Sequence, residues 1–259
     1  MIRADLNGFS LRTVALACTA MLAATAGCTT SVMGTGVSAL SSVTPAQLCP
    51  EAGAGQAAAA ALVACISTNV SDYWTSEVGQ LVEEFIDVDP DPQTVPDECR
   101  AFLSFGTAFY CPADTSVYIT GAALERDAIA FGDDLPYAIA VIVAHEYGHV
   151  VQAVVHQPGL DANEGTDAQS RATEQQADCL AGVWVRHSAR AGRVNPVTFR
   201  AAFEQELTII SGLPLPPGVG PDGYDEIATH GTVTERVAAY DMGVAGGSGT
   251  ACGLLGLGD

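Results

Sequence analysis

The chain has 259 residues, enough for one substantial hydrophobic core or for one domain with a tail. It contains 30 acidic and 10 basic residues, a formal net charge of −20, and all of the basic residues are arginines. Because the arginines form no cluster that could neutralise a phosphate backbone, this composition argues against a nucleic-acid partner.

The N-terminus has the composition of an export signal that covers residues 1–27. Two arginines flank the start of an apolar stretch at residues 13–26, which is too short to span a bilayer as a permanent helix. The stretch ends in Thr-Ala-Gly-Cys at residues 25–28, which resembles a bacterial lipobox. We therefore expect lipidation of Cys28 to anchor an exported protein at the cell surface or envelope; the alternative is a secreted protein. We expect that no later segment is long and apolar enough to cross a membrane.

Residues 28–45 are rich in Ser, Thr, Gly and Val and carry no charged side chain. Such a composition favours a flexible tether over a packed domain. We therefore divide the chain into a signal peptide of the lipoprotein type, a tether, and one folded domain at residues 46–259.

Six cysteines lie outside the signal peptide and the lipobox. An even number of cysteines in an exported chain predicts disulfides, and six cysteines allow fifteen pairings. Closeness along the chain favours two bridges and elimination leaves the third, which gives Cys49–Cys65, Cys99–Cys111 and Cys179–Cys252. No pair has C-x-x-C spacing, so we do not expect a zinc site built from thiols.

Apolar periodicity and composition predict seven helices, at residues 57–66, 70–86, 124–131, 135–156, 169–190, 196–210 and 232–240. Residues 109–112 indicate a turn that leads into a short strand at residues 116–119. Prolines and glycines predict loops at residues 87–98 and 212–224. The fold class is therefore α+β and mainly helical, with a short strand region before the long apolar helix at residues 135–156.

That apolar helix contains the pattern H-E-x-x-H at residues 145–149. Residues four apart lie on one face of a helix, so His145 and His149 can present their imidazoles to one metal ion. Zinc accepts imidazole nitrogen readily, and Glu146 beside it can take a proton from a zinc-bound water. The pattern therefore predicts one catalytic Zn²⁺ and a peptidase site.

A catalytic zinc needs a third protein ligand, and Glu174 is our candidate. It follows His149 by 25 residues, on a predicted helix that could return antiparallel to the first. Asp178 lies one turn further on, placed to accept the second ring N–H of a ligand histidine. Asp178 is also a rival for the third ligand, and both acids could instead be exposed side chains of an amphipathic helix. Their proximity to H-E-x-x-H favours the ligand interpretation.

Three further histidines need an interpretation, and one of them has a candidate role. His156 and His187 are predicted to be structural or surface residues. His230 follows a predicted loop and precedes a helix that Thr232 or Thr234 would cap. A loop histidine that reaches over the site could donate a hydrogen bond to the oxyanion, so we name His230 as a candidate donor against an ordinary surface or capping role.

Four segments of the chain resemble those of the bacterial neutral zinc metallopeptidases in both order and spacing. They are residues 108–119, 144–152, 174–184 and 230–237. The resemblance implies a zincin-like fold in which His145, His149 and Glu174 bind zinc and Glu146 is the general base and acid. Two departures stand out: the family often has a second histidine where Val150 stands, and residues 29–69 have no evident counterpart.

These observations predict an exported, membrane-anchored zinc metallopeptidase that acts on a peptide or protein substrate. The alternative from another class is a lipoprotein that keeps the zincin scaffold as a binding or envelope-assembly module without turnover. The intact Glu146 favours the enzyme, because a module without turnover has no need of a base. A third hypothesis is an accidental H-E-x-x-H in a structural domain that is held together by disulfides.

Overall fold

The computed structural model describes residues 48–49, 56–79, 81, 86–155, 166–215 and 226–254. All of them belong to one compact unit, Leu40–Asp259. The predicted signal peptide, the lipidation site at Cys28 and the predicted tether lie outside the described residues, so these assignments and the domain start at residue 46 stay predictions.

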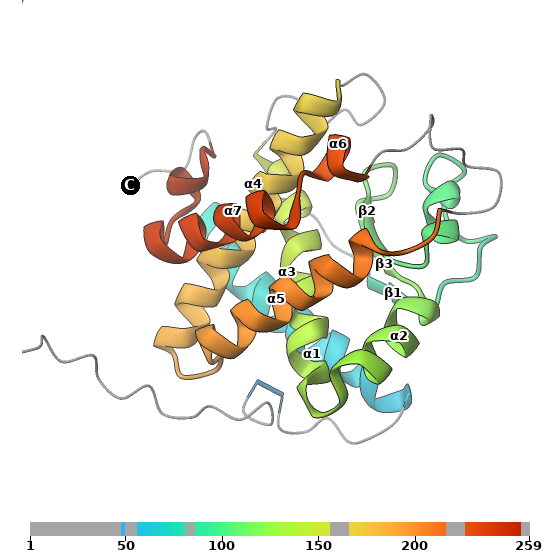
Figure 1. Cartoon of the computed structure of the whole chain (residues 1–259), viewed down its shortest axis with the longest axis horizontal. Helices are drawn as coiled ribbons and strands as arrows, with labels where there is room; N and C mark the ends of the chain where they lie inside the picture. Colours follow the sequence, from blue (N-terminus) through green and yellow to red (C-terminus); the bar gives the residue numbers. More distant parts are fainter. Residues whose placement is uncertain are drawn as a thin grey trace, which may run out of the picture. The chain divides into compact units, whose positions relative to one another are not determined.

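Helices form most of the described chain, and a small sheet accompanies them (Figure 1). The α-helices are α1 Gln56–Val78, α2 Gly121–Phe131, α3 Leu135–Val154, α4 Asp167–Arg190, α5 Pro196–Ser211, α6 Glu226–His230 and α7 Val233–Gly246. Short 3-10 helices are η2 Arg100–Phe105, η3 Gly132–Asp134 and η4 Gly249–Cys252, and the strands are β1 Ile86–Val88, β2 Ala108–Cys111 and β3 Ser116–Ile119. The predicted α+β, mainly helical class is confirmed.

The first helical region differs from its prediction. One helix, α1, replaces the two predicted at residues 57–66 and 70–86, and it ends at Val78. Gly79 follows with φ +91°, a left-handed conformation that glycine adopts without strain and that stops a helix. Ile86 lies in β1 instead, because its backbone pairs with β3. Apolar spacing alone could not distinguish this strand from a helix end.

The sheet has the order β1-β3-β2, with β1 parallel and β2 antiparallel to β3. Residues 109–111, predicted as part of a turn, form strand β2, and the turn lies at residues 112–115. Phe109 is 8% exposed and stacks on its cross-strand partner Tyr118 with ring centroids 5.3 Å apart. Such a cross-strand aromatic pair stabilises a short hairpin, which explains the strand.

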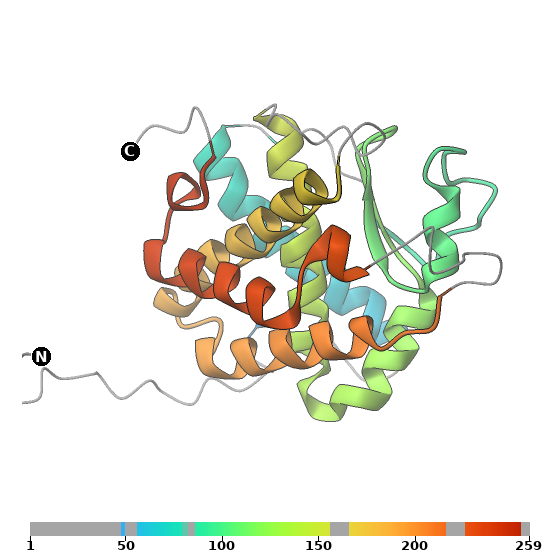
Figure 2. The same ribbon diagram turned by 45° about the horizontal axis from the view of Figure 1, so that its top comes forward.

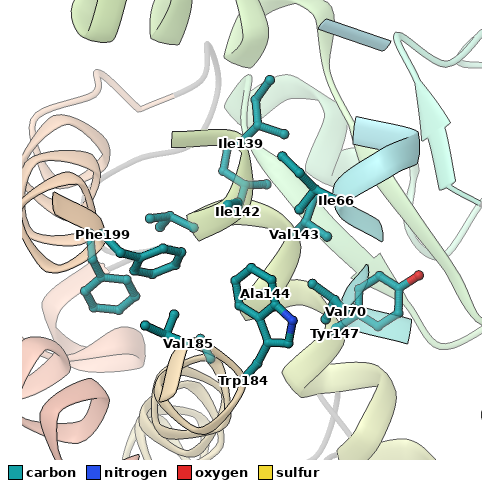
Figure 3. Close-up of a cluster of buried hydrophobic side chains, with 14 of the residues drawn as sticks. Ile66, Val70, Ile139, Ile142, Val143, Ala144, Tyr147, Trp184, Val185 and Phe199 are labelled. Carbon is teal, nitrogen blue, oxygen red and sulfur yellow. The ribbon is translucent and has the colours of Figure 1, made fainter. Parts of the chain in front are cut away.

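Helix α3 runs through the hydrophobic core. Its residues 138–144 are each at most 6% exposed. Ile66 and Val70 of α1, Trp184 of α4 and Phe199 of α5 surround it (Figure 3). Figure 2 shows α4 and α7 on one side of α3 and the strands on the other. Burying a large apolar side chain contributes about 1.5–3 kcal/mol, so this packing holds α3 in place.

The prediction that no segment after the signal is long and apolar enough to cross a membrane was wrong. By length and composition, the stretch Gly121–Val154 is long and apolar enough to cross a membrane, with a mean hydropathy of 1.3. The stretch is interrupted at η3, however, and α3 is packed inside the protein. A helix that is buried on most sides has the same composition as a membrane span, so the apolarity of α3 is explained by the core.

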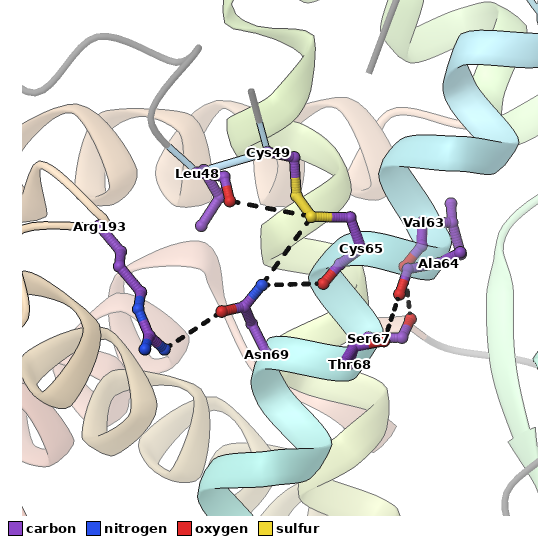
Figure 4. Close-up of a disulfide and its surroundings, with 9 residues drawn as sticks. All are labelled: Leu48, Cys49, Val63, Ala64, Cys65, Ser67, Thr68, Asn69 and Arg193. Carbon is purple, nitrogen blue, oxygen red and sulfur yellow. Dashed lines mark hydrogen bonds between the residues drawn. A yellow bond between two sulfur atoms is a disulfide. The ribbon is translucent and has the colours of Figure 1, made fainter. Parts of the chain in front are cut away.

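The described residues contain the three predicted disulfides, Cys49–Cys65, Cys99–Cys111 and Cys179–Cys252. The first ties Leu48 and Cys49 to α1 (Figure 4). Asn69, one turn further along α1, donates to the Cys65 carbonyl at 2.9 Å and accepts from Arg193 at 3.1 Å. The disulfide therefore ties Cys49 to α1, and the hydrogen bond between Asn69 and Arg193 ties α1 to the turn after α4.

Candidate metal centre

Helices α3 and α4 contact each other and run in opposite directions. His145 of α3 contacts Asp178, whereas His149, one turn later, contacts Glu174, one turn earlier on α4. The predicted antiparallel return is therefore correct. Thr166 caps α4 in a capping box with Gln169, which starts the helix just before the predicted position.

Gly148 within H-E-x-x-H allows the two helices to approach closely. A Cβ at this position would lie 2.7 Å from the Cα of Ala177 and 2.9 Å from its carbonyl oxygen. Both are backbone atoms, which cannot rotate away as a long side chain can. The close contact brings the α4 carboxylates within reach of the α3 histidines.

His145, His149 and Glu174 form a group whose candidate ligand atoms all lie within 4.8 Å of one another. The distance from His145 Nε2 to Glu174 Oε2 is 3.1 Å, and that from His149 Nε2 to Glu174 Oε1 is 3.5 Å. Tetrahedral ligands at zinc bond lengths lie about 3.3 Å apart. Glu174 Oε2 is also buried without a hydrogen bond of acceptable geometry. The donor set therefore fits a zinc ion.

Asp178 supports His145 and is not part of the ligand group. Its Oδ1 lies 2.9 Å from His145 Nδ1. Arg236 of α7 donates to both carboxylate oxygens, through Nε at 2.8 Å and Nη2 at 2.9 Å. Asp178 is fully buried, so this bidentate pair compensates a charge that would otherwise be costly. This role of Arg236 could not be predicted from the sequence, because no local pattern links residues separated by 58 positions.

Glu146 lies on α3 between the two histidines in sequence and is 6% exposed. Burial raises the pKa of its carboxyl group, although the neighbouring histidines oppose the shift. The backbone N–H of Tyr110 in β2 donates to this carboxylate. Glu146 is therefore held between the ligand group and the edge of the sheet.

His230 is the last residue of the short helix α6, where a loop had been predicted. Its Nε2 lies 3.7 Å from Glu174 Oε2, so the structure brings it to the metal centre. Arg171 of α4 donates to the Ala228 carbonyl at 3.2 Å and holds α6 against α4. His187 instead is exposed and packs on Tyr73 at 4.5 Å between ring centroids, as a structural residue would. His156 lies outside the described residues.

The family described as "Putative neutral zinc metallopeptidase" matches residues 7–255 of the chain. The chain belongs to this family. The resemblance inferred from four segments is thereby confirmed, whereas the expectation that residues 29–69 have no counterpart was wrong, since they lie within the matched range.

Two curated proteins that are similar to this chain are themselves named as uncharacterized. The uncharacterized protein YpfJ of Escherichia coli K12 is 30% identical over 168 residues, which cover 61% of this chain and 57% of the relative. The uncharacterized protein Rv2575 of Mycobacterium tuberculosis H37Rv is 28% identical over 163 residues, 58% of this chain and 56% of the relative. The chain thus spans little more than half the length of these curated relatives. No solved structure gives a significant match.

In this member of the family, the electrostatics of the centre favour protons on the histidines when no metal competes. Burial lowers the pKa of His145, but hydrogen bonds to Asp178 and Glu174 outweigh it and raise the pKa to about 10. The pKa of His149 is also raised, since the charge of Glu174 overcomes its burial. Burial opposes ionisation of Glu174, yet the charges of His230 and His149 hold its pKa well below the ordinary value. A bound cation would replace these protons.

Proposed function

We propose that this chain is an exported, membrane-anchored zinc peptidase that hydrolyses peptide bonds in peptide or protein substrates. One observation carries the proposal: the Nε2 atoms of His145 and His149 converge on Glu174, and Glu146 lies beside them. Three protein ligands leave one coordination position for substrate or water, which is the arrangement of catalytic zinc.

Zinc, when bound by these three residues, supplies Lewis-acid polarisation of the substrate carbonyl. Glu146 takes a proton from the attacking water and passes it to the leaving amine. Its raised pKa brings it closer to neutral pH, where a general base is most effective. The Thr229 hydroxyl lies 2.9 Å from His230 Nδ1 and can donate to it. With the ring proton on Nε2, His230 would donate to the oxyanion.

The edge of the sheet suggests how a peptide would bind. Among the described strands, β2 is an edge strand. The Thr120 N–H donates to the Thr107 carbonyl, so the alternating backbone groups of Ala108 and Tyr110 point away from β3. Because the Tyr110 N–H already donates to Glu146, an extended peptide added to this edge would pair with Ala108 and pass along the metal centre.

Export is supported by the disulfides. Three bridges join all six cysteines of the described residues. Disulfides persist in oxidising compartments and are rare in the bacterial cytosol, so they agree with the signal expected at residues 1–27. The lipid anchor at Cys28 rests on the lipobox resemblance alone.

Two variants separate metal binding from proton transfer. Glu146→Gln is expected to keep the zinc of the parent and to lose casein cleavage by a factor of about 10²–10⁴, because it removes the general base. Glu174→Ala is expected to lose most of the zinc that the parent binds, because it removes one of the three protein ligands. Zinc content by elemental analysis and cleavage with and without a chelator are the measurements.

The outcomes distinguish the peptidase from its alternatives. A parent that binds zinc but never cleaves casein or a peptide library supports a binding module on the same scaffold. A parent without zinc, or a Glu174→Ala protein that binds zinc as tightly as the parent, contradicts the assigned ligand set.

A further inference from the structure

The two ligand histidines are supported by chemically different partners. His145 Nδ1 contacts the carboxylate of Asp178 at 2.9 Å. His149 Nδ1 contacts the amide oxygen of Gln152 at the same distance of 2.9 Å. Gln152 is 0% exposed, so its amide group must find all its partners within the protein.

The partners of Gln152 extend away from the metal centre. Its Nε2 donates to the Thr173 carbonyl at 2.8 Å and to Gln176 Oε1 at 2.9 Å. Gln176 Nε2 in turn donates to the Cys252 carbonyl at 2.9 Å. His149, Gln152, Gln176 and the Cys252 carbonyl thus form one chain of hydrogen bonds, which runs from α3 through α4 to η4. We call this chain of hydrogen bonds the relay.

Two backbone carbonyls determine the direction of every bond in this chain. The carbonyls of Thr173 and Cys252 can only accept, so each must face the NH₂ group of a glutamine. With both amides oriented in this way, the Gln152 oxygen faces His149 and also can only accept. The proton of His149 must then lie on Nδ1, which leaves the Nε2 lone pair directed at the ligand group. Flipping either glutamine would bring two acceptors together.

The relay also avoids adding charge to the site. The Asp178 carboxylate is compensated by the guanidinium of Arg236. Among the described residues, the side chain of Gln152 contacts the His149 ring, the Thr173 carbonyl and the Gln176 amide, and no arginine. A carboxylate there would be buried without a paired cation, whereas an amide orients the ring at no such cost.

A disulfide holds the far end of the relay. Cys252 ends η4 and is bonded to Cys179, the residue after Asp178 on α4. The sequence separation of 73 residues makes this the longest loop that any of the three described bridges closes. The bridge therefore keeps the Cys252 carbonyl beside Gln176.

We propose that Gln152 and Gln176 are positioning residues that hold His149 in its metal-binding tautomer, and that the Cys179–Cys252 disulfide anchors them. The inference rests on the proposed function, because it concerns the zinc ligands of that site. It assigns the C-terminal disulfide a role in metal affinity in addition to holding the chain end.

Zinc affinity tests the relay. Gln152→Met keeps the side-chain volume and removes both the acceptor and the donors, so zinc affinity is expected to fall about 10–100-fold in competition with a chromophoric chelator. Gln176→Met should fall in the same direction by a smaller factor. Gln205→Met is the matched control, because Gln205 donates to the Ala130 carbonyl on the exposed surface and should leave affinity unchanged.

A second measurement separates positioning from general damage. In zinc-loaded protein labelled with ¹⁵N-histidine, the parent should show slowly exchanging Nδ1–H protons for both His145 and His149. Gln152→Met should lose the signal of His149 alone, since Asp178 still holds the proton of His145. A protein that is merely destabilised would lose both. Loss of both signals, or retention of both with the affinity of the parent, overturns the proposal.

Removing the disulfide tests the anchor. The double variant Cys179→Ala with Cys252→Ala keeps the Cys252 carbonyl and frees η4, so zinc affinity and the His149 signal should both decrease. The matched control is Cys49→Ala with Cys65→Ala, which removes a bridge on α1 (Figure 4) and should change neither. Equal effects of the two double variants contradict the anchor. If the parent protein itself binds no zinc, the proposed function is contradicted. The zinc affinity of the parent therefore distinguishes failure of the proposed function from failure of the relay.

Discussion

Three carboxylates in and around the metal centre have pKa values that their surroundings shift in different directions. Burial raises the pKa of Glu146, which suits a group that must accept a proton. Burial acts on Asp178 in the same direction, but Arg236 and His145 outweigh it and lower the pKa. Glu174 is kept ionised by the histidines around it. The same chemical group thus suits three proposed roles: Glu174 as a ligand, Asp178 as the support of a ligand, and Glu146 as the base.

Outside the metal centre, a pair of buried acidic residues lies between α2 and α5. Asp127 is 0% and Glu206 is 1% exposed. Arg126 bridges them, through Nε to Asp127 at 2.8 Å and through Nη2 to Glu206 at 2.7 Å. Burial and the charge of Asp127 raise the pKa of Glu206 to about 7, although Arg126 opposes this shift.

The raised pKa predicts a pH dependence of stability. The pKa of Glu206 is higher in the folded state than its ordinary value of 4.5, so the folded state binds this proton more tightly. Its contribution to the free energy of unfolding is therefore complete below about pH 4.5. That contribution is lost as the pH rises through about 7. The free energy of unfolding in urea should therefore fall by about 1–3 kcal/mol between these limits. Glu206→Gln should flatten the decrease, and the exposed Glu204→Gln should not; equal slopes in both contradict the prediction.

At the scale of elements, the metal centre depends on one helix–helix contact. Helix α3 supplies His145 and His149, and α4 supplies Glu174 from the facing side. The predicted boundaries of α4 were accurate because its signals are local, with a capping threonine at its start. The predicted end of α1 was wrong because the partner of β1 lies 31 positions away, at Val117 for Ile86. Local signals therefore located the helices better than the strands.

Gly148→Ala tests this contact. The added methyl group would overlap the backbone of Ala177, so the helices must separate and the free energy of unfolding should fall by about 1–3 kcal/mol. Glu174 would move away from the histidines, and zinc affinity should fall with it. Gly212→Ala is the control, since its new Cβ would meet atoms only at 3.5 Å or beyond. A Gly148→Ala protein with the stability and zinc affinity of the parent would show that the contact is not limiting.

For the molecule as a whole, the disulfides and the N-terminal pattern both favour the proposed export, and the net charge bears on the class of partner. The net charge of −20 predicts that the chain has no nucleic-acid partner, and this stays a prediction. Three disulfides fit an oxidising compartment. The chain spans a little over half the length of its curated relatives, so the substrate and any partner are proposals for this chain alone.

Replacing Cys28 tests the anchor. If Cys28 is lipidated, the parent should sediment with the membrane fraction and enter the detergent phase after extraction. Cys28→Ser should remain exported and appear in the soluble fraction, because one removed acyl anchor abolishes membrane binding. The domain is the same in both, so zinc content serves as the folding control. A parent that is already soluble outside the cell supports the secreted alternative.

By itself, the sequence determined the features that depend on neighbours within a turn or two. The five helices predicted after residue 121 were largely correct, although α6 was not predicted. H-E-x-x-H located two ligand candidates, and cysteine spacing together with elimination predicted the three bridges. Glu174 was found because its helix and its distance from His149 match a known pattern. Each of these inferences rests on periodicity, capping or spacing along the chain.

Only the tertiary structure decided which distant residues support the ligands. Arg236 pairs with Asp178 across 58 positions, and Gln176 reaches the Cys252 carbonyl across 76. It also separated Glu174 from its rival Asp178 and placed His230 at the centre on a helix. The physical reason is that buried charges and amides must be satisfied by whichever groups the fold brings near them, and no periodic pattern along the chain records that choice.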